Sequence, residues 1–147
     1  MRVSVDGVLP VGAPTAWAHL TRWERQAAWM RDADRVRVVG SQREGVGVRI
    51  AVRTRVLGVP AFTDVLEIVR WEPPRLLLMA HLRFVHGSGE WRLDPMDEAH
   101  TRFTWTEDVR LGVPLVGEIA LRVYAVVMRR LMARAIEGLA SEFGSRA

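Results

Sequence analysis

The chain of 147 residues contains no cysteine and no lysine, and it has a single tyrosine. Without cysteine it can form no disulfide and offers no thiolate as a nucleophile or metal ligand. All 21 basic residues are arginines, so the high isoelectric point reflects the pKa of arginine, while the net charge is only +4. The arginines are scattered along the chain without a dense run, which argues against a nucleic-acid interface.

Neither a membrane-spanning segment nor a secretory signal is expected from the sequence. The most apolar stretch, 113–128, is interrupted by Glu118 and Arg122. Near the N-terminus, Asp6 and Gly7 stand where a secretory signal would be apolar. The sequence shows no internal repeat and no linker. These features predict one domain over residues 1–147 that is soluble and cytoplasmic, without stable membrane insertion.

The most regular feature present is a long helical pattern near the C-terminus. Between Pro114 and Phe143, apolar or small residues recur at steps of three and four, which indicates one buried helical face. Pro114 suits the first turn of a helix and Gly144 suits its C-terminal cap. The expected buried stripe consists of Gly117, Ala120, Leu121, Tyr124, Val127, Met128, Leu131, Met132, Ala135, Leu139 and Phe143.

The segments before this helix have the character of strands and two short helices. Apolar and polar residues alternate most clearly over 48–57 and 101–111, which is typical of a sheet with one covered face. Gly87-Ser88-Gly89 and the stretch 95–99 are interpreted as turns, and two short helices are expected within 13–30. The expected strands are 3–9, 35–40, 48–57, 62–71, 76–85, 90–94 and 101–111. This order predicts an α+β domain in which the long helix covers one face of an antiparallel sheet.

Several short motifs, taken in order, resemble the bacterial polyketide cyclase/dehydrase and lipid-transport type of the SRPBCC (START-like, helix-grip) superfamily. They are Ala13-Pro14-Thr15-Ala16-Trp17, Trp29, Glu72-Pro73-Pro74-Arg75-Leu76, Gly89-x-Trp91-x-Leu93-x-Pro95 and Thr101-Arg102-Phe103-Thr104-Trp105. The resemblance implies a curved sheet of about seven strands wrapped around the long helix, with two short helices after the first strand. It also implies a cavity between sheet and helix that accepts a hydrophobic molecule. The matching residues belong mostly to turns and packing positions, so they do not specify an activity.

Combined with the strand alternation, the resemblance gives a set of residues expected to line the cavity. Glu107 is the sharpest candidate for chemistry, because alternation places it beside Phe103 and Trp105 on the covered face. A carboxylate there could act as an acid or base or anchor a ligand, unless the strand end lets it reach water. The full set is Val52, Thr54, Leu66, Leu78, Trp91, Phe103, Trp105, Glu107, Ala120, Tyr124 and Val127.

Other polar residues remain open from the sequence. Asp64 lies in a segment whose two faces are both mixed, so its direction cannot be assigned. His81 alternates with Leu77 and Met79 and either faces the cavity or serves as a structural histidine. His86 and His100 are assigned to turns. The four histidines show no metal-ligand spacing, and no phosphate loop, nucleotide loop or catalytic triad is present, so neither a metal nor a cofactor is expected.

Three functions are compatible with these observations. The favoured one is binding or carriage of a small hydrophobic molecule, of lipid or polyketide/aromatic type, with Glu107 or Tyr124 as polar anchor. The second is a cyclase/dehydratase-like enzyme that uses the same cavity, which would require two converging polar groups. The third is a protein-interaction module without a ligand, recognisable by an exposed apolar patch. A homodimer is left open.

Overall fold

The computed structural model describes residues 1–56, 58–83, 85–111 and 118–144. Its seven strands form one antiparallel sheet in the order β1-β7-β6-β5-β4-β3-β2. The strands are β1 (Arg2–Leu9), β2 (Ala33–Val39), β3 (Arg49–Val56), β4 (Val59–Glu72), β5 (Leu76–His81), β6 (Val85–Asp97) and β7 (His100–Leu111). The helices are α1 (Ala13–Leu20), the short 3₁₀ helix η1 (Trp23–Ala28) and α2 (Glu118–Gly144). The predicted α+β class and order of elements are confirmed.

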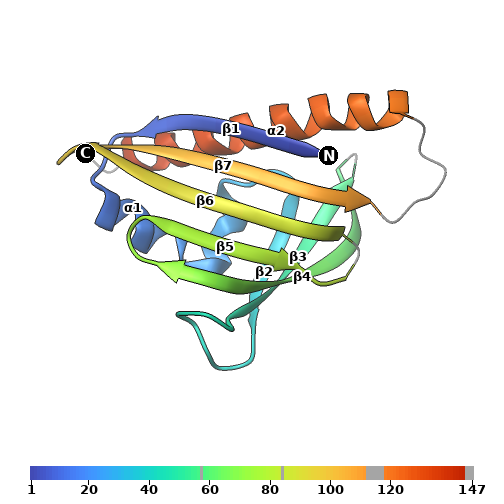
Figure 1. Ribbon diagram of the computed structural model, residues 1–147, viewed down its shortest axis with the longest axis horizontal. Coiled ribbons are helices and arrows are strands. Elements are labelled where there is room, and N and C mark those ends of the chain that lie inside the picture. The colour runs from blue at the N-terminus through green and yellow to red at the C-terminus, as the bar shows by residue number, and fades with distance from the viewer. Residues whose placement is uncertain (57, 84, 112–117, 145–147) are drawn as a thin grey trace.

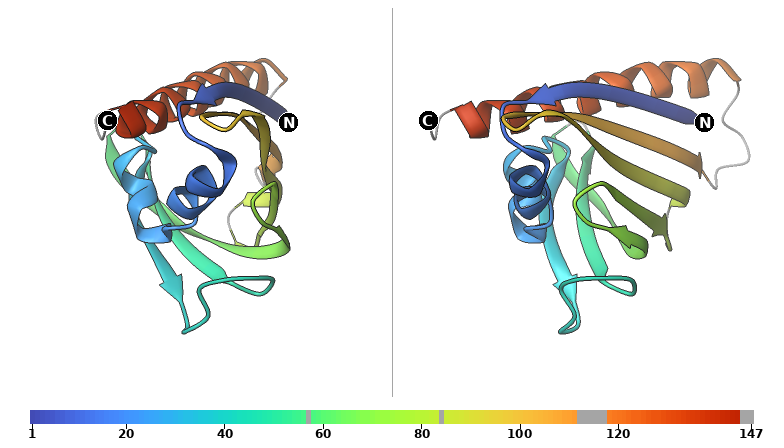
Figure 2. Two further views of the ribbon diagram at one scale, coloured as in Figure 1. Left: turned by 90° about the vertical axis from the view of Figure 1, so that its left-hand side faces the viewer. Right: turned by 60° about the vertical axis from the view of Figure 1, so that its left-hand side comes forward.

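The sheet is strongly curved, and α2 lies across its open side next to β1 (Figure 1). α1 and η1 follow β1 in the chain and sit together at one end of the curved sheet (Figure 2). Because consecutive strands pair as hairpins, the sheet is a meander from β2 to β7, and β1 adds to its far edge.

Strand β7 shows how alternation produces the two faces of the sheet. Phe103, Trp105 and Glu107 are all buried on the inner face, as the sequence predicts, whereas Arg102 and Asp108 point outward. Trp105 stands opposite Trp91 in the β6–β7 pairing, so their rings share the inner face. The inner face therefore supplies the broad apolar surface that α2 needs.

One turn prediction is wrong, and a second covers too many residues. Gly87-Ser88-Gly89 lies inside β6 instead of forming a turn, and the chain reverses earlier, between His81 and Val85. Gly87 has φ 131°, and a Cβ there would lie 2.1 Å from the carbonyl oxygen of Asp108 on the neighbouring strand. The glycine therefore marks a close approach of two backbones, not a reversal. β6 also runs through Pro95 to Asp97, so the turn predicted over 95–99 is confined to Glu98 and Ala99. Consequently His86 and His100 belong to strands.

Helix α2 divides into two halves. In the C-terminal half, the side chains of Met132, Ala135, Ile136, Leu139 and Phe143 are buried. In the N-terminal half, Ala120 and Val127 are exposed, so the predicted buried stripe holds only for the second half. The predicted start at Pro114 lies outside the described residues. None of the described helices is long and apolar enough to cross a membrane.

The close contact between α2 and the sheet depends on a glycine in β1. A Cβ at Gly7 would lie 2.5 Å from Cγ2 of Ile136, so the helix could not approach β1 this closely if the residue were larger. At the helix terminus, His19 of α1 lies with Nε2 2.7 Å from Oε2 of Glu142. These contacts hold the C-terminal half of α2 against both β1 and α1.

Candidate functional site: a cavity lined by an ion-paired histidine

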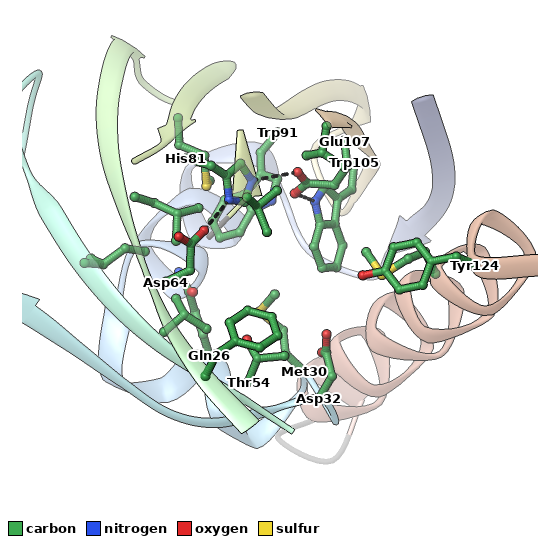
Figure 3. Close-up of a pocket in the computed structure, with 18 residues that line it drawn as sticks. Gln26, Met30, Asp32, Thr54, Asp64, His81, Trp91, Trp105, Glu107 and Tyr124 are labelled. Carbon is green, nitrogen blue, oxygen red and sulfur yellow. Dashed lines mark hydrogen bonds and ion pairs between the residues drawn. The ribbon is translucent and has the colours of Figure 1, made fainter. Parts of the chain in front are cut away.

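A cavity of about 120 Å³ lies under the sheet, on the side of the exposed half of α2 (Figure 3). This volume is of the same order as the engineered apolar cavities that hold one benzene ring. Residues from η1, the segment after it, five strands and α2 contribute to the wall. They are Gln26, Met30, Asp32, Ile50, Val52, Thr54, Phe62, Asp64, Leu66, Met79, His81, Val85, Trp91, Trp105, Glu107, Val109, Tyr124 and Met128.

Most of the residues expected to line the cavity do lie on its wall. The residues found there are Val52, Thr54, Leu66, Trp91, Trp105, Glu107 and Tyr124. Leu78 does not line it, because its neighbours Leu77 and Met79 occupy the inner face of β5. Phe103 is fully buried in the core, beyond the wall, while Ala120 and Val127 lie on the exposed part of α2. A contribution of any of these residues to binding remains a prediction.

The main polar feature of the wall is a line of three ionisable side chains from β4, β5 and β7. Nδ1 of His81 lies 2.7 Å from Oδ2 of Asp64, and Nε2 lies 3.0 Å from Oε2 of Glu107. The indole Nε1 of Trp105 donates a 2.7 Å hydrogen bond to Oε1 of Glu107. Asp64 and Glu107 are both buried, at 4% and 7% exposure. The carboxylate of Glu107 therefore does not reach water at the strand end, which was the open alternative.

The charge state of this network follows from its hydrogen bonds. Burial alone would lower the pKa of His81, but hydrogen bonds and the charges of Asp64 and Glu107 outweigh it and raise the pKa to about 9. His81 is therefore an imidazolium at neutral pH and donates from both nitrogens to carboxylates. Three strands of the sheet supply the three side chains, and each hydrogen bond orients the next side chain in the line.

Gly89 in β6 makes room for this network. A Cβ at this position would lie 2.8 Å from Oε1 and 3.1 Å from Oε2 of Glu107. Its partner in the neighbouring strand is Glu107 itself. The glycine therefore leaves space for the carboxylate of Glu107 to lie against the sheet and face His81. This space explains why a glycine precedes Trp91 in the Gly-x-Trp motif at this site.

Two further ionisable residues stand across the cavity from His81 (Figure 3). Asp32 follows η1, and burial, together with the charge of Glu107, raises the pKa of its carboxyl group. Tyr124 projects from α2, and burial followed by the charges of Asp32 and Glu107 raises the pKa of its phenol. Asp32, Glu107 and Tyr124 all line the same cavity.

Several wall residues were not singled out from the sequence. Gln26, Met30 and Asp32 come from η1 and the turn after it, where no periodicity indicates which side faces inward. The sequence does not decide whether His81 and Asp64 face inward, and only the paired strands bring them together. In the described part of the chain, no group of three or more side chains is arranged to hold a metal ion.

Comparison with solved structures identifies the class of fold. An aromatase/cyclase from Streptomyces sp. R1128 superimposes with a TM-score of 0.83 at 18% identity, covering 99% of this chain and 94% of that one. A protein from Thermus thermophilus gives 0.83 at 16% identity over 100% and 99% of the two chains. A START superfamily protein from Mycobacterium smegmatis gives 0.75 at 13% identity over 96% and 97%. No curated protein matches the chain in sequence.

A curved seven-stranded antiparallel sheet with a long C-terminal helix and two short helices after β1 is the helix-grip, START-like fold. The family model for polyketide cyclase/dehydrase and lipid transport matches residues 1–144. The chain belongs to this family. At these identities the solved structures establish the fold and not the ligand.

Proposed function

We propose that this protein binds a small, largely apolar molecule in the cavity and holds its polar end at the His81 network. The observation that carries the proposal is the position of Asp64, His81 and Glu107 on the wall of a cavity. Burying three ionisable groups costs free energy that a packed apolar wall would not cost. Groups of this kind are expected where a ligand needs a fixed polar partner.

The remaining wall supports the same conclusion. Phe62, Trp91, Trp105 and Tyr124 provide aromatic surfaces, and aliphatic residues from β3 and β4 fill the space between them. The indole N–H of Trp91 is buried and has no acceptor among the described residues. An oxygen atom on the ligand could accept from this donor and gain a hydrogen bond without losing one. A ring with one polar end therefore fits the wall better than a plain hydrocarbon.

A titration with matched variants tests this proposal. A panel of single-ring compounds that differ in their polar end is first screened by thermal shift, and binders are titrated by NMR with the Trp105 indole N–H as reporter. Glu107→Gln is expected to weaken the best binder about tenfold, which corresponds to about 1.4 kcal/mol. Tyr124→Phe is expected to have a smaller effect, because Tyr124 lies at the edge of the cavity.

The matched control is Glu90→Gln, on the outer face of the neighbouring strand, where the carboxylate pairs with Arg92. This variant should bind as the wild type does. Equal affinities in Glu107→Gln and Glu90→Gln would exclude the network as the anchor, and a panel without any binder would contradict the proposal as a whole.

A dehydratase-like enzyme is the second candidate, and the imidazolium between two carboxylates favours it. In a β-hydroxy ketone, Glu107 would accept a proton from the carbon next to the carbonyl, and the C–O bond would break as His81 protonates the departing hydroxyl to water. The proton would then return from Glu107 to His81 across their 3.0 Å contact. 4-Hydroxy-4-phenylbutan-2-one is a suitable probe, since its enone product absorbs in the near ultraviolet. No enone above the rate of the His81→Gln variant would exclude this candidate.

A further inference from the structure

The distribution of charge between the inside and the outside of the sheet is uneven. Three carboxylates line the cavity, namely Asp32, Asp64 and Glu107, and the only cationic group on the described wall is His81. Both nitrogens of His81 already contact carboxylates. A ligand in the cavity therefore faces more negatively charged than positively charged side chains. The one positive group on the described wall, His81, is already hydrogen-bonded to Asp64 and Glu107.

The arginines lie elsewhere. Arg35, Arg37 and Arg53 gather on the outer face of β2 and β3, where Arg35 and Arg53 are cross-strand partners. No arginine belongs to the described wall of the cavity. A fatty acid or another carboxylate would consequently lose its hydration on entry without gaining a counter-ion, and it would stand close to like charges.

Asp32 is the member of the acidic set with the least compensation. Asp34, two residues later, forms ion pairs with Arg53 and Arg55. Asp32 forms no ion pair with any of the described arginines. Its carboxylate stands across the cavity from the His81 network (Figure 3). A positively charged group placed between Asp32 and the His81 network would lie close to Asp32 and in the electric field of Glu107. Burial raises the pKa of Tyr124, and the charges of Asp32 and Glu107 both raise it further.

The aromatic side chains around this position favour the same kind of ligand. Phe62, Trp91, Trp105 and Tyr124 line the cavity, and the electron-rich face of such a ring attracts a cation electrostatically. A cavity of about 120 Å³ is of the size that holds about one aromatic ring. Carboxylate, aromatic surfaces and limited volume together describe a site for a small organic cation.

We infer that the ligand is a small hydrophobic amine, whose ammonium group lies between Asp32 and the carboxylate of Glu107 in the Asp64–His81–Glu107 network. This inference rests on the proposed function, because it concerns the ligand of the same cavity. It argues against a fatty acid as the ligand, because the described wall has no basic side chain apart from His81, which already contacts two carboxylates.

Three probes of nearly equal size test the inference: 2-phenylethylamine, 2-phenylethanol and phenylacetate. The expected order of affinity at pH 7 is amine, then alcohol, then carboxylate, measured by NMR titration on the full chain. Asp32→Asn should weaken the amine about tenfold and leave the alcohol unchanged. Asp34→Asn, which removes an outer carboxylate already paired with arginines, should change neither.

The outcomes separate the two proposals. If the amine binds the wild type no more tightly than the alcohol does, the inference is wrong but the proposed function stands. The same conclusion follows if phenylacetate binds more tightly than the amine. The wild-type comparison does not depend on whether Asp32→Asn folds. If none of the three probes binds, both the inference and the proposed cavity function fail for ligands of this size.

Discussion

The two ends of the space between the sheet and α2 differ in packing: one end is filled by side chains, and the other contains a cavity. At the closed end, formed by α1, β1 and the C-terminal half of α2, Leu20, Phe103 and Leu139 are almost completely buried. At the open end, the same sheet faces a cavity, and Ile119, Val123 and Val126 of α2 are more than half exposed. One helix therefore serves as a core element over its second half and as a border of the cavity over its first half.

The difference shows how the fold separates stability from recognition. Apolar burial and ring contacts such as His19 on Phe143, with centroids 4.8 Å apart, fill the closed end. The open end holds the buried ionisable groups, which contribute less to stability than apolar packing of the same volume would. Substitutions at the closed end should therefore change folding, and substitutions at the open end should change binding and pH dependence.

The largest expected effect comes from removing packing at the closed end. Leu139→Ala deletes a fully buried side chain and should lower the free energy of unfolding by about 3–4 kcal/mol, because a cavity replaces its contacts. Chemical denaturation followed by circular dichroism measures this change. The matched control, Val126→Ala on the exposed half of α2, should change it by less than about 0.5 kcal/mol. Equal losses in both variants would contradict the division of α2 into two halves.

A smaller effect, confined to alkaline pH, is expected from the open end. The pKa of His81 is raised from 6.5 to about 9, so the unfolded state loses its proton before the folded state does. The stabilisation from this group is present below about pH 6.5 and is lost as the pH rises through 9, by a total of order 3 kcal/mol. Unfolding measurements from pH 6 to pH 10 on the wild type and on His81→Gln give the difference in free energy of unfolding between the two proteins.

Groups such as the N-terminal amine titrate in the same range but occur in both proteins, so their contributions cancel. The free energy of unfolding of the wild type should exceed that of His81→Gln at about pH 6.5, and this difference should disappear as the pH rises through 9. A difference that stays constant with pH would show that His81 keeps an ordinary pKa and that the network is not an ion pair.

The sequence could predict the fold, and it could predict one face of the site but not the whole of it. Alternation in β7 is regular, so Trp105 and Glu107 were assigned to the inner face correctly. Segment 62–71 is mixed on both faces, and a register irregularity near Thr54 and Arg55 shifts its pairing with β3, so the direction of Asp64 could not be assigned. Asp32 follows a 3₁₀ turn that carries no periodicity at all.

Glycine misled the prediction in β6 for a related reason. Gly87 and Gly89 resemble turn residues in a single sequence, yet one permits a close strand approach and the other gives space to Glu107. Both functions depend on a neighbouring strand, which local sequence does not identify. The helical stripe of α2 was similarly continuous in sequence, although the sheet covers only its second half.

The most direct test of the cavity as a binding site is native mass spectrometry of the purified protein, followed by organic extraction. The wild type is compared with Val52→Trp, which fills the cavity from β3, and with Arg53→Trp, which places the same ring on the outer face of that strand. We expect a molecule of constant mass on the wild type and on Arg53→Trp, and we expect its loss from folded Val52→Trp. Equal occupancy in all three proteins, or none in the wild type, would contradict this expectation.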